Sequence, residues 1–250
     1  MFTRVERVVI GVADLPRATQ TFTSLGFELH ATPESAFAFN ADDSLELLPA
    51  SAGHGLRSIV IESDDLGADL EAMRGRGIEV SDPLSHPGGR AELGRGTPLP
   101  LQFSQRPAEP RRPHVCAHPN QVERLERTYI VVPHLPALVE TYARVLGLPV
   151  PPVQRGNVIK ADMCIFDVGP VGIGVAQPVE PGPAASALER RGPGPFQVLF
   201  RTRSMSAGAD WMRTHGLPPP ARGTRNTGEQ AMLVGPDQAC GAYVAFVGPE

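Results

Sequence analysis

The sequence predicts an α+β fold that repeats one β-α-β-β module four times, and three observations support this prediction. Residues 5–15 (VERVVIGVADL) and residues 125–135 (LERTYIVVPHL) are two copies of one phrase. Residues 58–77 match residues 197–216 at a constant offset through a strand, a helix and the glycine that follows it. The order of apolar patterns is the same after each copy, so the chain divides into two similar halves.

The first module shows this order clearly. Residues 2–14 contain the β-branched run Val8–Ile10 and predict a strand. Residues 15–29 carry apolar side chains at helical spacing, and Gly26 is a suitable left-handed terminator for the helix. Residues 36–48 (AFAFNADDSLELL) predict a hairpin of two strands.

The other three modules repeat the pattern of strand, helix and closing strands. Their predicted elements are residues 55–65, 66–77 and 91–105, then 125–135, 136–147 and 162–177, then 195–203, 206–216 and 229–248. Residues 106–124 are rich in Pro and Arg and show no periodicity. We therefore expect a first domain at residues 1–106, a linker at 107–122 and a second domain at 123–250.

The composition argues against several classes of protein. The 250 residues carry a net charge of −4, which does not suit a nucleic-acid partner. The sequence lacks both a long apolar run of the kind that spans a membrane and the pattern of a signal peptide. Its three cysteines are odd in number and far apart, so they do not form a disulfide framework. We expect a cytoplasmic monomer or homodimer whose partner is a small-molecule ligand or substrate, with no nucleic acid and no membrane.

The doubled pair of modules resembles the vicinal oxygen chelate superfamily, which includes glyoxalase I, methylmalonyl-CoA epimerase, extradiol dioxygenases and bleomycin resistance proteins. The resemblance rests on VERVVIGVADL with SLGFEL, on LERTYIVVPHL with YARVLGLPV, and on GLRSIVIESDDL. The linker residues His118–Asn120 are also similar to those of two-domain glyoxalase-like proteins. The resemblance implies four βαβββ modules that form two cup-shaped mixed sheets. It further implies a divalent metal in a cup, held by His and Glu side chains on the strands.

The residues at the implied ligand places do not suit a metal. These places hold Arg7, Ser58, Glu46 and Gln102 in the first domain, and Arg127, Gln197, Gly174 and Ala245 in the second. A guanidinium has no lone pair to donate and repels a cation. We therefore expect both metal sites to be lost, with no metal as cofactor.

Arginine at the floor of a cup offers a different function. Arg127 and Arg7 could bind a carboxylate, enolate or phosphate through charge-assisted hydrogen bonds. The alternatives are a structural ion pair, for example with Glu46, or a side chain that faces outward.

The second domain contains two further groups of polar residues. Lys160, Asp162 and Cys164 lie at alternate positions of one predicted hairpin arm, and would share a face. The segment 221–233 carries Arg225, Asn226 and Glu229, and predicts a loop at the mouth of the cup. The ligand-binding candidates are thus Arg7, Arg127, Lys160, Gln197, Arg225 and Asn226, and the candidate catalytic bases are Glu229 and Asp162. A solvated polar turn is the alternative for both groups. His114, Cys116 and His118 are of metal-ligand type, but three alternating residues in a proline-rich linker do not have the spacing of a zinc site, so we do not expect them to bind metal.

Three functions remain open from the sequence. The first is a glyoxalase-like protein with lost metal sites, which binds a small anionic or aromatic molecule in the cup of the second domain. The alternative is an enzyme of the same superfamily: a lyase, an isomerase or a ring-cleaving dioxygenase. It would use a relocated divalent metal or metal-free acid–base chemistry. The third is an assembly module whose cups are filled by side chains.

Overall fold

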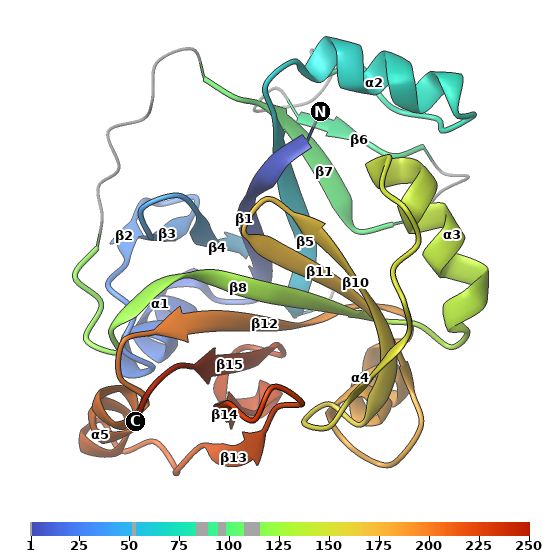
Figure 1. Ribbon diagram of the computed structural model, residues 1–250. Coiled ribbons are helices and arrows are strands. Elements are labelled where there is room, and N and C mark those ends of the chain that lie inside the picture. The colour runs from blue at the N-terminus through green and yellow to red at the C-terminus, as the bar shows by residue number, and fades with distance from the viewer. Residues whose placement is uncertain (1, 52–53, 84–89, 95–98, 108–115) are drawn as a thin grey trace.

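The computed structural model describes residues 2–51, 54–83, 90–94, 99–107 and 116–250. They form two mixed β-sheets flanked by five helices (Figure 1). The predicted fold class of two α+β domains with paired modules is therefore confirmed. None of the helices in the described part of the chain is long and apolar enough to cross a membrane.

The first sheet contains seven strands in the order β2-β3-β4-β1-β5-β7-β6. The strands are β1 (Phe2–Val12), β2 (His30–Ala31), β3 (Ala36–Phe39), β4 (Ser44–Pro49), β5 (Gly55–Ser63), β6 (Arg90–Glu92) and β7 (Leu101–Gln105). The helices of this half are α1 (Leu15–Ser24) and α2 (Leu66–Gly75). Strand β1 pairs parallel to β4 and antiparallel to β5, so it joins the two modules at the centre of the sheet.

The second sheet contains eight strands in the order β13-β14-β15-β12-β8-β11-β10-β9. The strands are β8 (Val122–Val131), β9 (Gln154–Gly156), β10 (Ala161–Val168), β11 (Val171–Pro178), β12 (Gly194–Thr202), β13 (Ala221–Thr224), β14 (Gln230–Val234) and β15 (Tyr243–Val247). Its helices are α3 (Leu135–Leu146), α4 (Pro183–Arg191) and α5 (Met205–Thr214), and a short 3-10 helix spans Pro236–Gln238. As in the first sheet, the central pair of strands, β8 and β12, is antiparallel.

Local sequence explains where the helices begin and end. Asp14 caps α1 by accepting a hydrogen bond from the backbone N–H of Arg17, and Ser204 caps α5 in the same way. Helix α3 ends at Gly147, whose φ of 67° is the left-handed conformation that glycine adopts without strain. The repeat is thus visible in the caps as well as in the strands.

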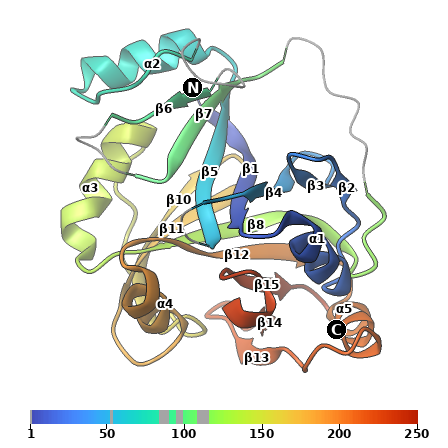
Figure 2. The same ribbon diagram turned by 180° about the vertical axis from the view of Figure 1, so that it is seen from behind.

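The two halves share one hydrophobic core. Phe27, which follows α1, packs its ring 5.0 Å from Phe200 and 6.0 Å from Phe246 of the second half. Helix α1 lies beside α5, and α2 lies beside α3, in both views (Figures 1 and 2). Trp211 on α5 donates a hydrogen bond to the carbonyl oxygen of Thr23, at 3.0 Å. Because the halves are joined by core packing, their cups have fixed relative positions.

Two elements differ from the sequence-based prediction. Helix α4 was not expected, although it begins with Pro183 and continues with helix-favouring residues up to Arg191. The predicted loop at residues 221–233 is instead strand β13, a tight turn and part of strand β14. This segment therefore belongs to the edge of the second sheet and is held by strand pairing.

The linker is partly outside the described residues, because positions 108–115 are not among them. Its end is firmly packed: Asn120 is buried and donates a hydrogen bond to the carbonyl oxygen of Leu25. The carboxylate of Asp43 accepts from the N–H of Leu125, at 3.0 Å, and so connects the turn before β4 to strand β8.

Candidate functional site

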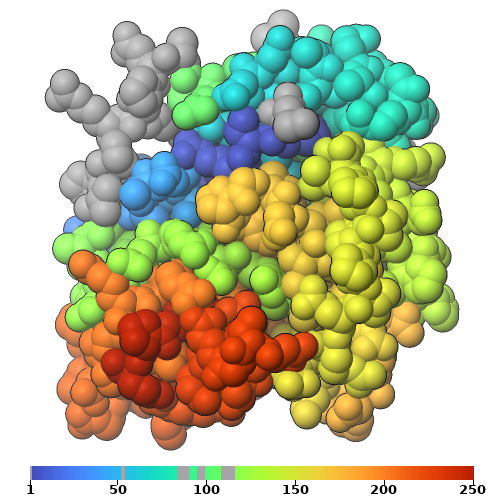
Figure 3. All heavy atoms as spheres, in the orientation of Figure 1, coloured from blue at the N-terminus to red at the C-terminus, as the bar shows by residue number. Residues whose placement is uncertain are grey.

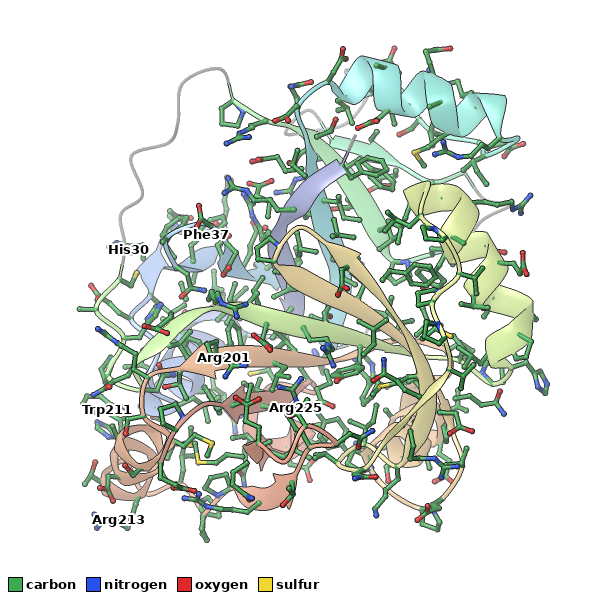
Figure 4. The ribbon with its side chains drawn as sticks, in the orientation of Figure 1. His30, Phe37, Arg201, Trp211, Arg213 and Arg225 are labelled. Carbon is green, nitrogen blue, oxygen red and sulfur yellow. The ribbon has the colours of Figure 1, made fainter. Side chains whose placement is uncertain are left out.

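The cup of the first domain is occupied by its own charged side chains. Arg7 donates to Glu46 at 3.0 Å and to Glu6 at 2.9 Å, and its side chain is only 8% exposed. The guanidinium also lies over the ring of Phe37, at 5.1 Å from the ring centre (Phe37 is labelled in Figure 4). The structure thus shows the ion pair with Glu46 that is the alternative to ligand binding at Arg7.

The same network continues across the sheet. Arg90 lies 3.6 Å from Glu46, and Gln102 donates to Glu92 at 2.7 Å. Ser104 donates to Glu6 at 2.8 Å. The charges of this network are thus paired within the first cup, although Nε of Arg7 is buried without a hydrogen-bond partner.

The cup of the second domain contains a cavity of about 100 Å³. Its lining comes from β8, β9, β10, β12, β14, β15 and the turns at the edges of the sheet. The apolar members are Tyr129, Val158, Ile159, Met163, Leu199, Ala231 and Ala245, and the polar members include Arg127, Gln154, Asn157, Gln197, Arg225, Asn226 and Thr227. Four of the six predicted ligand-binding residues therefore meet at this cavity.

Arg127 lies in the cavity wall without the partners that Arg7 has. Its Nη1 donates to the hydroxyl of Tyr129 at 3.3 Å, and its Nε is buried without a hydrogen-bond partner. Among the described residues, no carboxylate forms an ion pair with it. A half-buried guanidinium, with its Nε fully buried, is therefore left without a carboxylate partner at the cavity.

Gln197 adds a second unsatisfied group to the same wall. The residue is only 2% exposed, and its Oε1 is buried without a partner. Gln197 on β12 lies opposite Tyr129 on β8 in the strand register. Because Arg127 and Tyr129 are two positions apart on β8, their side chains point to the same face of the sheet.

Two glycines on β11 make room for these side chains. A Cβ on Gly172 would lie 3.0 Å from Nε of Arg127, and a Cβ on Gly174 would lie 2.5 Å from the ring of Tyr129. Larger residues would push Arg127 and Tyr129 from their positions. The glycine-rich stretch that lacks a metal ligand is thus what accommodates the arginine.

Contacts between opposite edges of the sheet bridge part of the mouth of the cavity. Asn226, in the turn between β13 and β14, accepts a hydrogen bond from the N–H of Asn157 at 3.2 Å and donates to the carbonyl oxygen of Arg155. A Cβ on Gly223 would lie 3.3 Å from Val158. In the space-filling view, the C-terminal strands meet the yellow segment around β9 (Figure 3). The sheet therefore curls until its edge strands touch over the cavity.

Comparison with known proteins agrees with this architecture. Residues 4–92 match the family model described as the Glyoxalase/Bleomycin resistance protein/Dioxygenase superfamily. A mutant of 4-hydroxymandelate synthase from Streptomyces coelicolor superposes with a TM-score of 0.70, at 14% identity, over 100% of this chain and 93% of that one. The first part of the chain is thus similar in sequence to this superfamily, and the whole chain shares its fold with the two-domain synthase.

A second solved structure has a similar fold. A fusion of a xylose isomerase-like TIM barrel with 4-hydroxyphenylpyruvate dioxygenase has a TM-score of 0.68 at 11% identity, over 99% of this chain and 49% of that chain. A search of curated proteins finds no significant match. At 14% and 11% identity the two solved structures show the fold alone. The chemistry depends on the side chains in the cup.

The implied metal-ligand places of the superfamily can now be examined in three dimensions. Arg127, Gln197 and Ala245 line one cavity, and Gly174 lies against the ring of Tyr129. Of these four side chains only Gln197 offers an oxygen lone pair. This donor set does not fit a divalent metal, which takes three or more His, Cys or carboxylate ligands.

Glu229 belongs to a charge cluster next to the cavity. It accepts hydrogen bonds from Arg201 and, at 2.7 Å, from Arg225 (both arginines are labelled in Figure 4). Glu126, which the sequence reasoning missed, accepts from Arg201 at 2.9 Å and pairs with Arg124 at 2.7 Å. Burial raises the pKa of Glu126, but the neighbouring arginines, above all Arg201, outweigh it and hold the pKa below its usual value. Arg225 thus reaches the cavity while its charge is already shared with carboxylates.

The remaining predicted residues lie outside the cavity. Asp162 forms an ion pair with Arg155 at 2.8 Å, on the face of β10 opposite Met163. Lys160 ends the turn before β10 with a φ of 58°, and its ammonium lies 3.9 Å from Glu180. Cys164, which was expected on the same face, is buried in the shared core. The alternation of β10 therefore directs the whole predicted group away from the cup.

A second cavity, of about 210 Å³, lies between the two halves of the protein. Arg57 of the first domain and Arg191 at the end of α4 contribute to its walls. Arg191 donates to the carbonyl oxygen of Leu56 at 3.1 Å, and burial, with repulsion by Arg190 and Arg57, lowers its pKa. Because two arginines contribute to its walls, this cavity is an alternative binding site for an anion.

Proposed function

We propose that the cup of the second domain binds a small organic carboxylate with an aromatic or otherwise apolar body, without a metal ion. The observation that carries this proposal is Arg127, whose buried Nε has no partner and whose guanidinium has no carboxylate among the described residues. A buried N–H group without a hydrogen-bond partner costs about 1–3 kcal/mol. A ligand carboxylate would supply the missing partner through charge-assisted hydrogen bonds.

Comparison of the two cups supports the assignment. At the equivalent place in the first domain, Arg7 is paired with Glu46 and Glu6. In the second domain the carboxylates of the charge cluster next to the cavity, Glu126 and Glu229, are paired with other arginines. The charge of Arg127 is therefore available to a ligand, whereas that of Arg7 is used inside the protein.

The rest of the cavity suits an apolar body with one polar substituent. Tyr129, Met163 and Leu199 offer aromatic and aliphatic surfaces. The Oε1 of Gln197 can accept a hydrogen bond from a ligand hydroxyl. The two structural neighbours are named for 4-hydroxymandelate and 4-hydroxyphenylpyruvate, which are both hydroxylated aromatic carboxylates, and this analogy supports the same ligand class.

The lining favours binding over acid–base catalysis. The described residues that line the cavity include no Asp, Glu, His or Cys. Proton abstraction requires such a group within hydrogen-bond reach of the substrate. Glu229 is held by two arginines and Asp162 lies on the opposite face, so neither is placed as a base. A cytoplasmic location and a monomeric or homodimeric state remain predictions.

The proposal is tested by calorimetric titration of 4-hydroxymandelate, and of its uncharged amide, into chelator-treated protein. We expect the carboxylate to bind more tightly than the amide. Arg127→Leu should weaken carboxylate binding by about 10- to 100-fold, because a hydrogen bond to a charged group contributes about 1.5–3 kcal/mol. Arg213→Leu, at an exposed arginine of α5, is the control and should leave binding unchanged. Equal affinity for acid and amide, or unchanged binding by Arg127→Leu, would contradict the proposal.

A further inference from the structure

A separate group of metal-binding side chains lies at the edge of the first sheet. Glu28, His30 and Cys116 each place a ligand atom within 4.8 Å of the other two. Cys116 is buried, at 6% exposure, His30 is half-buried, and Glu28 lies at the protein surface. The group is therefore accessible to an ion from solvent but has a sheltered sulfur at its base.

The fold holds these three residues together through backbone contacts. His30 lies on the short edge strand β2, paired with Phe37 of β3 (His30 is labelled in Figure 4). Cys116 is attached to the same edge because its N–H donates to the carbonyl oxygen of Phe39 at 3.0 Å. The N–H of Ala117 donates to Oε2 of Glu28 at 2.7 Å, which leaves the other carboxylate oxygen for a further contact. The juxtaposition thus depends on the end of the interdomain connection returning to β2.

The donor types select a class of metal. Thiolate sulfur, imidazole nitrogen and carboxylate oxygen are the three ligand types that Zn²⁺ takes in proteins, in tetrahedral sites. Calcium and magnesium prefer oxygen ligands alone, so a site with Cys and His does not suit them. We propose that Glu28, His30 and Cys116 bind a zinc ion, with a water molecule as fourth ligand. On binding, the thiol of Cys116 loses its proton to solvent as the sulfur–zinc bond forms.

The neighbouring histidine is not part of this site. His118 accepts a hydrogen bond from the N–H of Glu28 at its Nδ1, at 3.1 Å, and its Nε2 lies 3.2 Å from the side-chain oxygen of Asn40. Both ring nitrogens are therefore used. The sequence grouped Cys116 with His118 and with His114, which lies outside the described residues, whereas the structure brings Cys116 to Glu28 and His30.

A zinc ion at this place would fasten the end of the interdomain connection to the edge strand of the first sheet. Binding to the folded state alone stabilises it by mass action. The site is outside the cup of the second domain, and it shares no residue with the cavity there. Its occupancy is therefore independent of carboxylate binding by Arg127.

The test uses the full chain, stripped by chelator, reloaded with zinc and freed of excess metal. We expect one zinc ion per chain by elemental analysis, and a higher melting temperature that chelator reverses. Cys116→Ser and His30→Gln should lose the bound zinc, whereas Cys240→Ser, at another free cysteine, should keep it.

Cobalt substitution gives a readout that needs no variant. Co²⁺ bound by the unmodified protein should show a thiolate-to-cobalt charge-transfer band in the near ultraviolet, and Cys240→Ser should show the same band. Absence of this band in the unmodified protein would overturn the proposal. So would equal zinc binding by Cys116→Ser and the unmodified chain.

Discussion

Arg7 and Arg127 occupy equivalent places, yet replacement of each by Met is expected to have very different effects on stability. Arg7→Met leaves the carboxylates of Glu46 and Glu6 without their guanidinium, and these side chains are only 6% and 14% exposed. Removing one partner of a buried ion pair costs about 3–5 kcal/mol. Arg90, at 3.6 Å from Glu46, offsets part of this, so we expect a loss of about 3 kcal/mol.

Arg127→Met removes much less. Among the described residues, its one side-chain hydrogen bond is to the hydroxyl of Tyr129, at 3.3 Å, and a bond of this kind contributes about 1 kcal/mol. The substitution also removes the buried Nε–H, which has no hydrogen-bond partner, and this favours the variant. We therefore expect its free energy of unfolding to lie within about 1 kcal/mol of the unmodified value.

Urea unfolding followed by circular dichroism and by Trp211 fluorescence measures both free energies. The double variant Arg7→Met with Glu46→Met should recover part of the loss, because fewer buried charges remain without a partner. If Arg127→Met destabilises the protein as much as Arg7→Met does, Arg127 has a structural partner and the reasoning about the two cups is refuted.

Three further predictions follow from single contacts. Burial raises the pKa of Asp43 to about 6, so its contribution to stability is present below about pH 4 and is lost as the pH rises through 6. Urea unfolding of the unmodified protein relative to Asp43→Asn should thus show a relative loss of roughly 2 kcal/mol from pH 4 to 7, and a constant difference would count against this pKa. Gly174→Ala should lower the free energy of unfolding by about 1–3 kcal/mol and weaken carboxylate binding, because the added Cβ displaces Tyr129. Unfolding and titration curves that match those of the unmodified protein would show that the ring of Tyr129 moves aside without loss. Asn226→Ala should speed ligand release in stopped-flow experiments by opening the mouth of the cavity. Arg213→Leu, at the exposed arginine of α5, should not, and equal rates in both variants would show that Asn226 does not restrict the mouth.

The fold could be predicted from the sequence because each module carries a complete local pattern. Strands β5 and β12 and helices α2 and α5 keep the constant offset that the repeat indicated, down to the glycine after each helix. Helix α4 was missed although Pro183 and the residues after it favour a helix, because its proline- and glycine-rich flanks are typical of a loop. The residues of α4 favour a helix, but the predicted module of strand, helix and closing strands contains no helix at this position.

The site could be predicted only in part. Alternation along a strand and the position of a turn were enough to bring Arg127, Gln197, Arg225 and Asn226 to one cavity. Alternation alone does not say which face of a strand lines the cup, and the structure places Asp162 of β10 outside the cavity, beside Arg155. Whether an arginine is paired depends on contacts between residues far apart in the sequence, and these appear only in the folded chain.

The most direct test of the central claim is a crystal structure of the chelator-treated protein with 4-bromobenzoate, whose bromine locates the ring by anomalous scattering. The expected result is a carboxylate within hydrogen-bond distance of the guanidinium of Arg127, with the ring among Tyr129, Met163 and Leu199. A ligand found only in the interdomain cavity beside Arg57 and Arg191 would contradict the claim. So would a metal ion that lies in the cup between the ligand and Gln197.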